Sequence, residues 1–239
     1  MLYGLTALIS FGGSFIQSSC GFGFAIVFMA LCPMFMPFRT ASILEAIAAF
    51  FMVVYIAVKL RRHLDFKLLL PTTVAGVLCS WLGVNAMMQL SDKTLHRILG
   101  GTLLALVAYF VFFSGRVRLK PTLRNGVIAG MVSGFGGGLF NIGGPPMVAY
   151  FLSVTDDKEK YSANLQAFFC TNTLVVFLLH LLKGSVSSDM LPAALCALAG
   201  TAAGTFLGFV LFKRLSMRHI KKFVYLFMLI AGGYLLIFP

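Results

Sequence analysis

Long apolar runs fill most of this chain. No charged residue occurs in the stretches 1–38, 68–91, 98–115, 125–155, 161–182 and 190–212. Residues 40–58 form another such stretch, interrupted by Glu45, and 223–239 form a shorter one. A helix needs about 20 apolar residues to cross the hydrocarbon core of a bilayer. None of the runs alternates apolar and polar residues as the strands of a membrane barrel do. The pattern predicts an all-α polytopic membrane protein.

Composition supports this prediction. The chain is 59% apolar and 11% charged, with a mean hydropathy of +0.95, which excludes a water-soluble domain of this size. The net charge of +12 comes from Lys and Arg in short connections near Lys59, Arg116 and Lys213, as in the cytoplasmic loops of membrane proteins. We therefore expect membrane lipid around the protein and no nucleic-acid partner. The sequence contains no cofactor motif, metal-ligand cluster or nucleophile–base arrangement, so we expect neither a cofactor nor an enzyme.

Two glycine-rich stretches interrupt the apolar runs. They are Gln-Ser-Ser-Cys-Gly-Phe-Gly at 17–23 and the segment 134–146, which ends in Gly-Gly-Pro-Pro. Glycine disfavours a continuous helix, whereas proline is favoured in the first turn of a new one. Helices broken at matching positions in two halves are typical of transporter substrate sites. This pattern predicts a transporter.

The two halves of the sequence also resemble each other. Aligning Gly12 with Gly134 places Gly21 on Gly143, inside the two breaks. Ala-Phe-Phe at 49–51 then matches 167–169, Leu-Pro at 70–71 matches 191–192, and Gly83 matches Gly204. An ordered series of matches indicates duplication. We predict two membrane repeats, residues 1–120 and 121–239, each with one broken or re-entrant segment followed by three transmembrane helices.

The distribution of charge predicts that these repeats are inverted. The first connection of repeat one, residues 59–67, is basic, whereas in repeat two the basic connection is the second, residues 213–222. The positive-inside rule places both in the cytoplasm. This requires each broken segment to enter and return on one side, as a re-entrant hairpin or as two short helices. Both termini are then expected outside.

We expect the two breaks to meet near the membrane midplane and to hold a small anion. Free amides at helix N-termini bind anions, helped by the positive end of the helix dipole. The predicted substrate-binding residues are Gln17, Ser18, Ser19, Gly21, Gly23, Asn141, Gly143, Gly144, Pro145 and Gln166. Glu45 is a candidate for proton or ion coupling, because a carboxylate inside the membrane is costly; the alternative is an ion pair with Arg39. His180, near the end of its run, is expected to reach the membrane surface.

The residues of both breaks resemble the TauE/SafE family, the sulfite exporter or toluene-sulfonate uptake permeases of bacteria. The resemblance lies in Ser18–Phe24 and in residues 134–146, and extends over nearly the whole chain. It implies a multi-pass protein of the bacterial inner membrane. It also implies gradient-coupled transport of sulfite, an organosulfonate or a related oxyanion. An anion channel and a carrier of small organic acids unrelated to sulfur are the alternatives.

Overall fold

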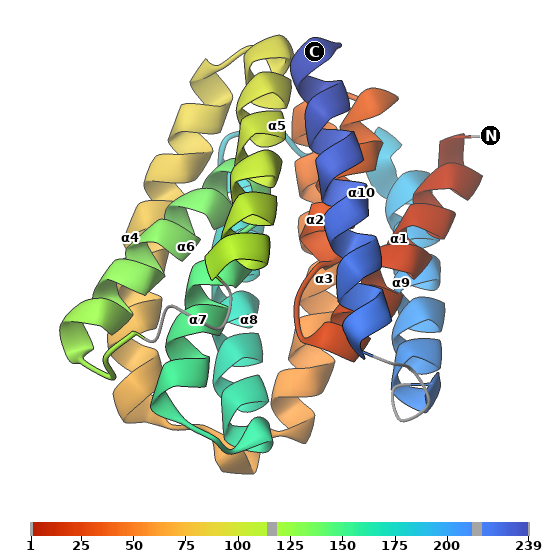
Figure 1. The fold of residues 1–239 in the computed structure, drawn as a ribbon. Helices are drawn as coiled ribbons and strands as arrows, with labels where there is room; N and C mark the ends of the chain where they lie inside the picture. Colours follow the sequence, from red (N-terminus) through yellow and green to blue (C-terminus); the bar gives the residue numbers. More distant parts are fainter. Residues whose placement is uncertain (1, 114–118, 212–216, 239) are drawn as a thin grey trace.

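A computed structural model describes residues 2–113, 119–211 and 217–238, and within these ranges the chain is helical without β-strands (Figure 1). The α-helices are α1 Leu2–Cys20, α2 Phe24–Leu31, α3 Phe38–Lys59, α4 Phe66–Gln89, α5 Asp92–Ala108, α6 Leu123–Phe140, α7 Gly144–Val154, α8 Lys158–Leu182, α9 Leu191–Leu211 and α10 Met217–Ile237. A π-helical turn, Tyr109–Phe113, continues α5. Short 3₁₀ turns occur at Cys32–Met34, Arg61–His63 and Ser188–Met190.

Five helical segments of the described chain are long and apolar enough to cross a membrane. They are Phe38–Lys59, Phe66–Gln89, Asp92–Phe112, Lys158–Leu182 and Ser188–Val210. Large apolar side chains also cover the outside of the molecule; on α4, for example, Leu70, Leu78 and Trp81 are all more than half exposed. An apolar exterior of this kind is suited to lipid rather than water. These features, together with the lengths of the helices, agree with the multi-pass membrane protein expected from the sequence.

Each half of the chain begins with a helical hairpin that folds around a glycine-rich break. The α1–α2 hairpin bends at residues 21–23, and the α6–α7 hairpin bends at 141–143. In Figure 1 the first hairpin opens toward the end of the molecule where both chain termini lie, and the second opens toward the opposite end. The second helix of each hairpin has only 8 or 11 residues, too few to span a hydrocarbon core that takes about 20.

The hairpins pack against helices from the other half of the chain. Helix α1 lies along α9, and α6 lies along α4 (Figure 1). Glycines allow this close approach: a β-carbon on Gly134 of α6 would overlap the carbonyl of Gly76, and one on Gly204 of α9 would overlap the carbonyl of Phe11. Small residues have this role in membrane helix packing. The two halves are therefore interlocked rather than side by side.

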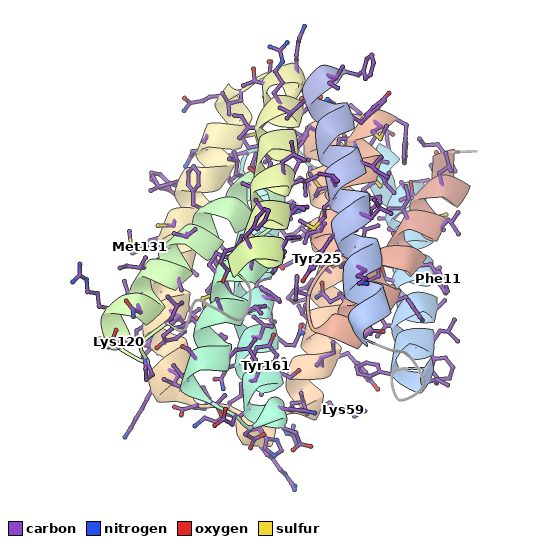
Figure 2. The ribbon with its side chains drawn as sticks, viewed as in Figure 1. Phe11, Lys59, Lys120, Met131, Tyr161 and Tyr225 are labelled. Atoms are coloured by element: carbon purple, nitrogen blue, oxygen red, sulfur yellow. The ribbon has the colours of Figure 1, made fainter. Side chains whose placement is uncertain are left out.

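The connections α3–α4 and α7–α8 meet at the lower end of Figure 1. Asp65 and Asp157 cap α4 and α8 by accepting backbone N–H groups of the first turn. The Asp65 carboxylate also lies 2.7 Å from Lys160 Nζ, and this hydrogen-bonded contact is the main reason that the pKa of Asp65 falls below its usual value of 3.8. The Lys59 and Lys120 side chains lie in the lower part of Figure 2, whereas α1 begins and α10 ends at the top of Figure 1.

Candidate functional site

A small cavity lies where the two breaks meet. Its volume is about 50 Å³, room for a few water molecules or one small anion. Both breaks, and helices α3 and α8 beside them, form its wall. The lining residues are Gln17, Phe22, Gly23, Ala25 and Ile26 at the first break; Gly137, Asn141, Ile142, Gly143, Gly144 and Pro145 at the second; Glu45, Ala49 and Val53 of α3; and Phe169, Asn172, Thr173 and Val176 of α8.

The first break is built by two glycines in left-handed backbone conformations. Gly21 has φ 85° and Gly23 has φ 124°, values that side chains rarely tolerate. The Gln17 side chain caps the new helix, because its Oε1 accepts the Phe24 N–H at 3.0 Å. The Gly21 carbonyl accepts Nε2 of Gln166, from α8, at 3.1 Å. The break is thus fixed to the long helix of the other half.

The second break has the same design with a different residue at its corner. Asn141 has φ 59°, and the N–H of Ile142 reaches back to the Gly136 carbonyl, which is a standard way to end a helix. The Asn141 Nδ2 donates to the Ser42 carbonyl of α3 at 2.8 Å. Each break is therefore fixed to the long helix of the opposite half.

This geometry corrects the alignment of the two breaks. Gly21 and Asn141 each follow the last residue of the first hairpin helix in a left-handed conformation. Gly21 is therefore structurally equivalent to Asn141, and Gly23 to Gly143, two residues away from the match chosen from the sequence. Asparagine replaces glycine because it is among the side chains that best tolerate this conformation.

Two short helices begin at the cavity wall. In α2, the first-turn residues Ala25 and Ile26 line the cavity, and helix geometry leaves their N–H groups without a carbonyl inside the helix. In α7, Pro145 and Pro146 have no N–H, so Gly143 and Gly144 supply the free amides. Amides of this kind, with the positive ends of helix dipoles behind them, favour an anion.

Glu45 lies in the cavity wall and is only 3% exposed. Glu45 and Asn141 line the same cavity. Arg39 does not pair with it: the Arg39 guanidinium donates to the Met88 carbonyl at 2.8 Å, and no ion pair reaches Glu45 within the described residues. The alternative expectation of an Arg39–Glu45 ion pair is wrong, because Arg39 points toward the end of α4.

Most of the expected site residues meet at this cavity. Gln17, Gly23, Glu45, Asn141, Gly143, Gly144 and Pro145 line it. Ser18, Ser19, Gly21 and Gln166 are not among its lining residues. Ser19 Oγ donates to the Phe15 carbonyl, and Ser18 packs against Gly208 of α9. Gly21 and Gln166 instead hydrogen bond to each other and fix the position of the first break.

Two polar residues of α8 acquire roles that the sequence did not reveal. Asn172 is 7% exposed and lines the cavity beside Gly137, with no partner for its Nδ2 among the described atoms. His180 is fully buried, with Nε2 3.4 Å from Ser42 Oγ, so the expectation that it reaches the surface is wrong. Ser42 Oγ also lies 3.5 Å from Asn141 Oδ1. Asn172 and His180 are eight residues apart, about two helical turns, and therefore lie on one side of α8. This spacing could have indicated from the sequence that both face the interior.

Comparison with known proteins agrees with this geometry. No curated protein and no solved structure matches the chain. A family model described as Sulfite exporter TauE/SafE matches residues 6–235, nearly the whole sequence. The matched span includes nearly all of the first hairpin, the whole second hairpin, both breaks and the cavity between them. The chain belongs to the sulfite exporter TauE/SafE family of membrane transporters.

Proposed function

We propose that this protein is a secondary transporter that carries a small sulfur oxyanion, such as sulfite or an organosulfonate, through the cavity between the two breaks. The observation that carries the proposal is the shared lining of that cavity, to which both breaks contribute helix N-termini. The family supplies the substrate class. The site supplies the means of holding an anion away from water.

The chemistry of the wall suits binding followed by release. Glu45 is the sole ionisable side chain among the described lining residues, and no Lys or Arg lies among them. An anion would therefore be held by backbone amides of Gly143 and Gly144, by the first turn of α2 and by the Asn172 amide. Helix ends provide a partial positive charge of about half a unit each. Such a site holds an anion less tightly than a buried, fully charged ion pair would.

Glu45 provides a physical reason for proton coupling. An ionised carboxylate in the same small cavity would repel the anion, since like charges interact strongly where water is excluded. The anion therefore binds together with a proton on Glu45. By linkage, each promotes binding of the other. Proton and anion then cross in the same direction, which is set by their combined gradients.

The arrangement of the two halves supports alternating access around this fixed point. We propose that the halves are inverted repeats, since their hairpins open toward opposite ends of the molecule (Figure 1). Each break is also fixed to the long helix of the other half. Rocking one half against the other would expose the same cavity first to one side and then to the other. The ends carrying Lys59 and Lys120 would face the cytoplasm.

Flux into liposomes tests the function directly. Purified protein would be supplied with sulfite, an alkyl sulfonate, sulfate and acetate, with and without a proton gradient. We expect saturable uptake of sulfite or the sulfonate against its concentration gradient when the outer solution, to which the anion is added, is more acidic than the interior. Flux that never saturates would indicate a channel, and saturable accumulation of acetate alone, above that in protein-free liposomes, would indicate a carrier of organic acids. Gly144→Ala should reduce the flux, because its β-carbon would lie 3.3 Å from Phe22; Gly101→Ala, in open space, is the matched control.

A further inference from the structure

A second, larger cavity lies on the outside of the molecule, between α3 and α9. It has a volume of about 620 Å³, within the range of roughly 300–1,000 Å³ typical of small-molecule pockets. It shares no described lining residue with the central cavity. Aromatic side chains flank it, and of these Phe51 and Phe206 are 59% and 72% exposed. We call this recess the α3–α9 groove.

The length of the groove matches one leaflet of a bilayer. Along α9 its lining extends from Leu198 to Val210, about 18 Å at the rise of a helix. Half of the hydrocarbon core of a bilayer measures about 15 Å. A groove of this length, open along the apolar exterior, has the dimensions of an acyl chain from a single leaflet.

One end of the groove is positively charged. Lys59, at the last turn of α3, extends over the Phe209 ring with Nζ 5.3 Å from the ring centroid. Tyr55 packs edge-on against the same ring. Arg61 and Arg62 follow directly, and both are exposed. An ammonium at the mouth of an apolar recess, beside further basic residues, favours an anionic lipid headgroup.

The wall of the groove also contains two hydroxyl groups that lack partners. Thr201 and Thr205 are 3% and 8% exposed, and both line the groove. Neither Oγ1 has a hydrogen-bond partner among the described atoms. The two residues are one helical turn apart and share a face of α9. Rotation about the Cα–Cβ bond would move each hydroxyl to another staggered position, from which it could donate to an ester carbonyl in the groove.

We propose that the α3–α9 groove is a binding site for an anionic phospholipid from the leaflet on the Lys59 side. The headgroup phosphate pairs with Lys59, the ester region lies within reach of Thr205 and Thr201, and an acyl chain fills the apolar remainder. The bound lipid packs against α3, the helix that also carries Glu45. This site is independent of the transported anion.

Native mass spectrometry of the intact protein tests the proposal, with phosphatidylglycerol and phosphatidylcholine as probes. We expect phosphatidylglycerol to bind preferentially. Lys59→Gln should reduce this preference by about fivefold, the effect of one basic residue near a membrane surface. Lys67→Gln, the same change at a basic residue outside the groove, should leave it unchanged. Thr201→Val with Thr205→Val should weaken binding of both lipids without changing the preference.

Two further measurements make the result decisive. Leu198→Trp places a bulky side chain within the groove and should remove the phosphatidylglycerol adduct, while the melting temperature in detergent confirms that the variant is folded. Equal loss of preference in Lys59→Gln and Lys67→Gln would overturn the proposal, because it would show attraction to the basic end in general. Phe206→Cys crosslinking between copies, with no lipid adduct, would overturn it in favour of a second copy of the chain as the occupant.

Discussion

Asn141 has two structural tasks that different substitutions can separate. Its backbone turns the chain at φ 59°, and its amide joins the second break to Ser42 of α3. Alanine would remove the amide and also strain the backbone, by about 1–2 kcal/mol for a left-handed residue. Glycine removes the amide but accepts the turn.

Asn141→Gly should therefore weaken transport while the protein keeps its fold. We expect about fivefold lower affinity for the anion, the scale of one neutral hydrogen bond, because the second break loses its link to the Ser42 carbonyl of α3. Concentration-dependent flux in liposomes measures this, and the melting temperature controls for folding. If the Asn141→Gly protein transports the anion with wild-type affinity, the site requires only the left-handed turn at this position and not the side-chain amide.

Glu45→Gln separates proton coupling from anion binding. Glutamine keeps the size and hydrogen bonding of a protonated carboxyl group but cannot release a proton. We expect anion exchange to continue and its dependence on the pH gradient to disappear. Glu159→Gln, the same change in a carboxylate whose side chain is 63% exposed, serves as the control. A Glu45→Gln protein that still concentrates the anion on a pH gradient would return Glu45 to a structural role.

The sequence predicted the positions of the two helix breaks better than it predicted the side-chain contacts around the cavity. Glycine and proline impose backbone constraints that are local, so both corners could be located from the sequence. Side-chain directions depend on helix rotation and on the neighbouring helix. Ser19 therefore bonds within its own helix, although it lies only two residues from Gln17 in the cavity wall. His180 lay close to the end of its run but is covered by tertiary packing.

At the scale of elements, the connections α3–α4 and α7–α8 are joined by ion pairs and a hydrogen bond, and we call this contact the joint. Lys160 pairs with Asp65, and His63 lies 2.8 Å from Glu159. The Asp65 N–H also donates to the Asn164 side chain of α8. This joint holds the starts of α4 and α8 together at the end of the molecule opposite the chain termini.

The stability of this joint should depend on pH in the acid range. Because the pKa of Asp65 is lowered in the folded state, chiefly by the hydrogen bond from Lys160, its contribution is present above about pH 4. That contribution is lost as pH falls through the lowered pKa. Lys160→Met should reduce the melting temperature at pH 7, and this difference should shrink as the pH falls below 3.8 and vanish below the lowered pKa of Asp65. A partly exposed ion pair contributes about 0.2–1 kcal/mol, so a small shift is expected.

Lys158→Met is the matched control for this measurement, since it changes another lysine of the same turn. We expect its melting temperature to follow the wild type at every pH. A Lys160→Met difference that does not shrink at any pH below 3.8 would show that the contact does not depend on ionised Asp65.

Element boundaries followed from the sequence more closely than element partners did. Charged residues and capping side chains such as Asp65 and Asp157 mark the helix ends, and these residues can be recognised in the sequence itself. The pairing of α1 with α9 and of α6 with α4 joins residues more than 50 positions apart. Glycines on α6 and α9 indicated close packing, but many helices could have filled that role.

The whole molecule is expected to have one cytoplasmic face. Single cysteines at Asp65, Asn125 and Arg218, introduced into a chain whose own cysteines are replaced, should all react with a membrane-impermeant reagent from the cytoplasmic side. The physical reason is the positive-inside rule acting on the basic connections. A control cysteine at Asn85, near the end of α4, should react from the other side. Labelling of Arg218 from outside while Asp65 reacts from inside would disprove the inverted arrangement.

Each hairpin packs against a helix of the other half of the chain, and this has a consequence for the synthesis and folding of the protein. Residues 2–113 contain α1 and α4 but neither of the helices, α9 and α6, that cover them. A nascent chain that stops after the first half would therefore expose to lipid the two surfaces on which the glycine-lined faces of α9 and α6 pack. The two halves made as separate polypeptides should assemble in the membrane, and each alone should be degraded.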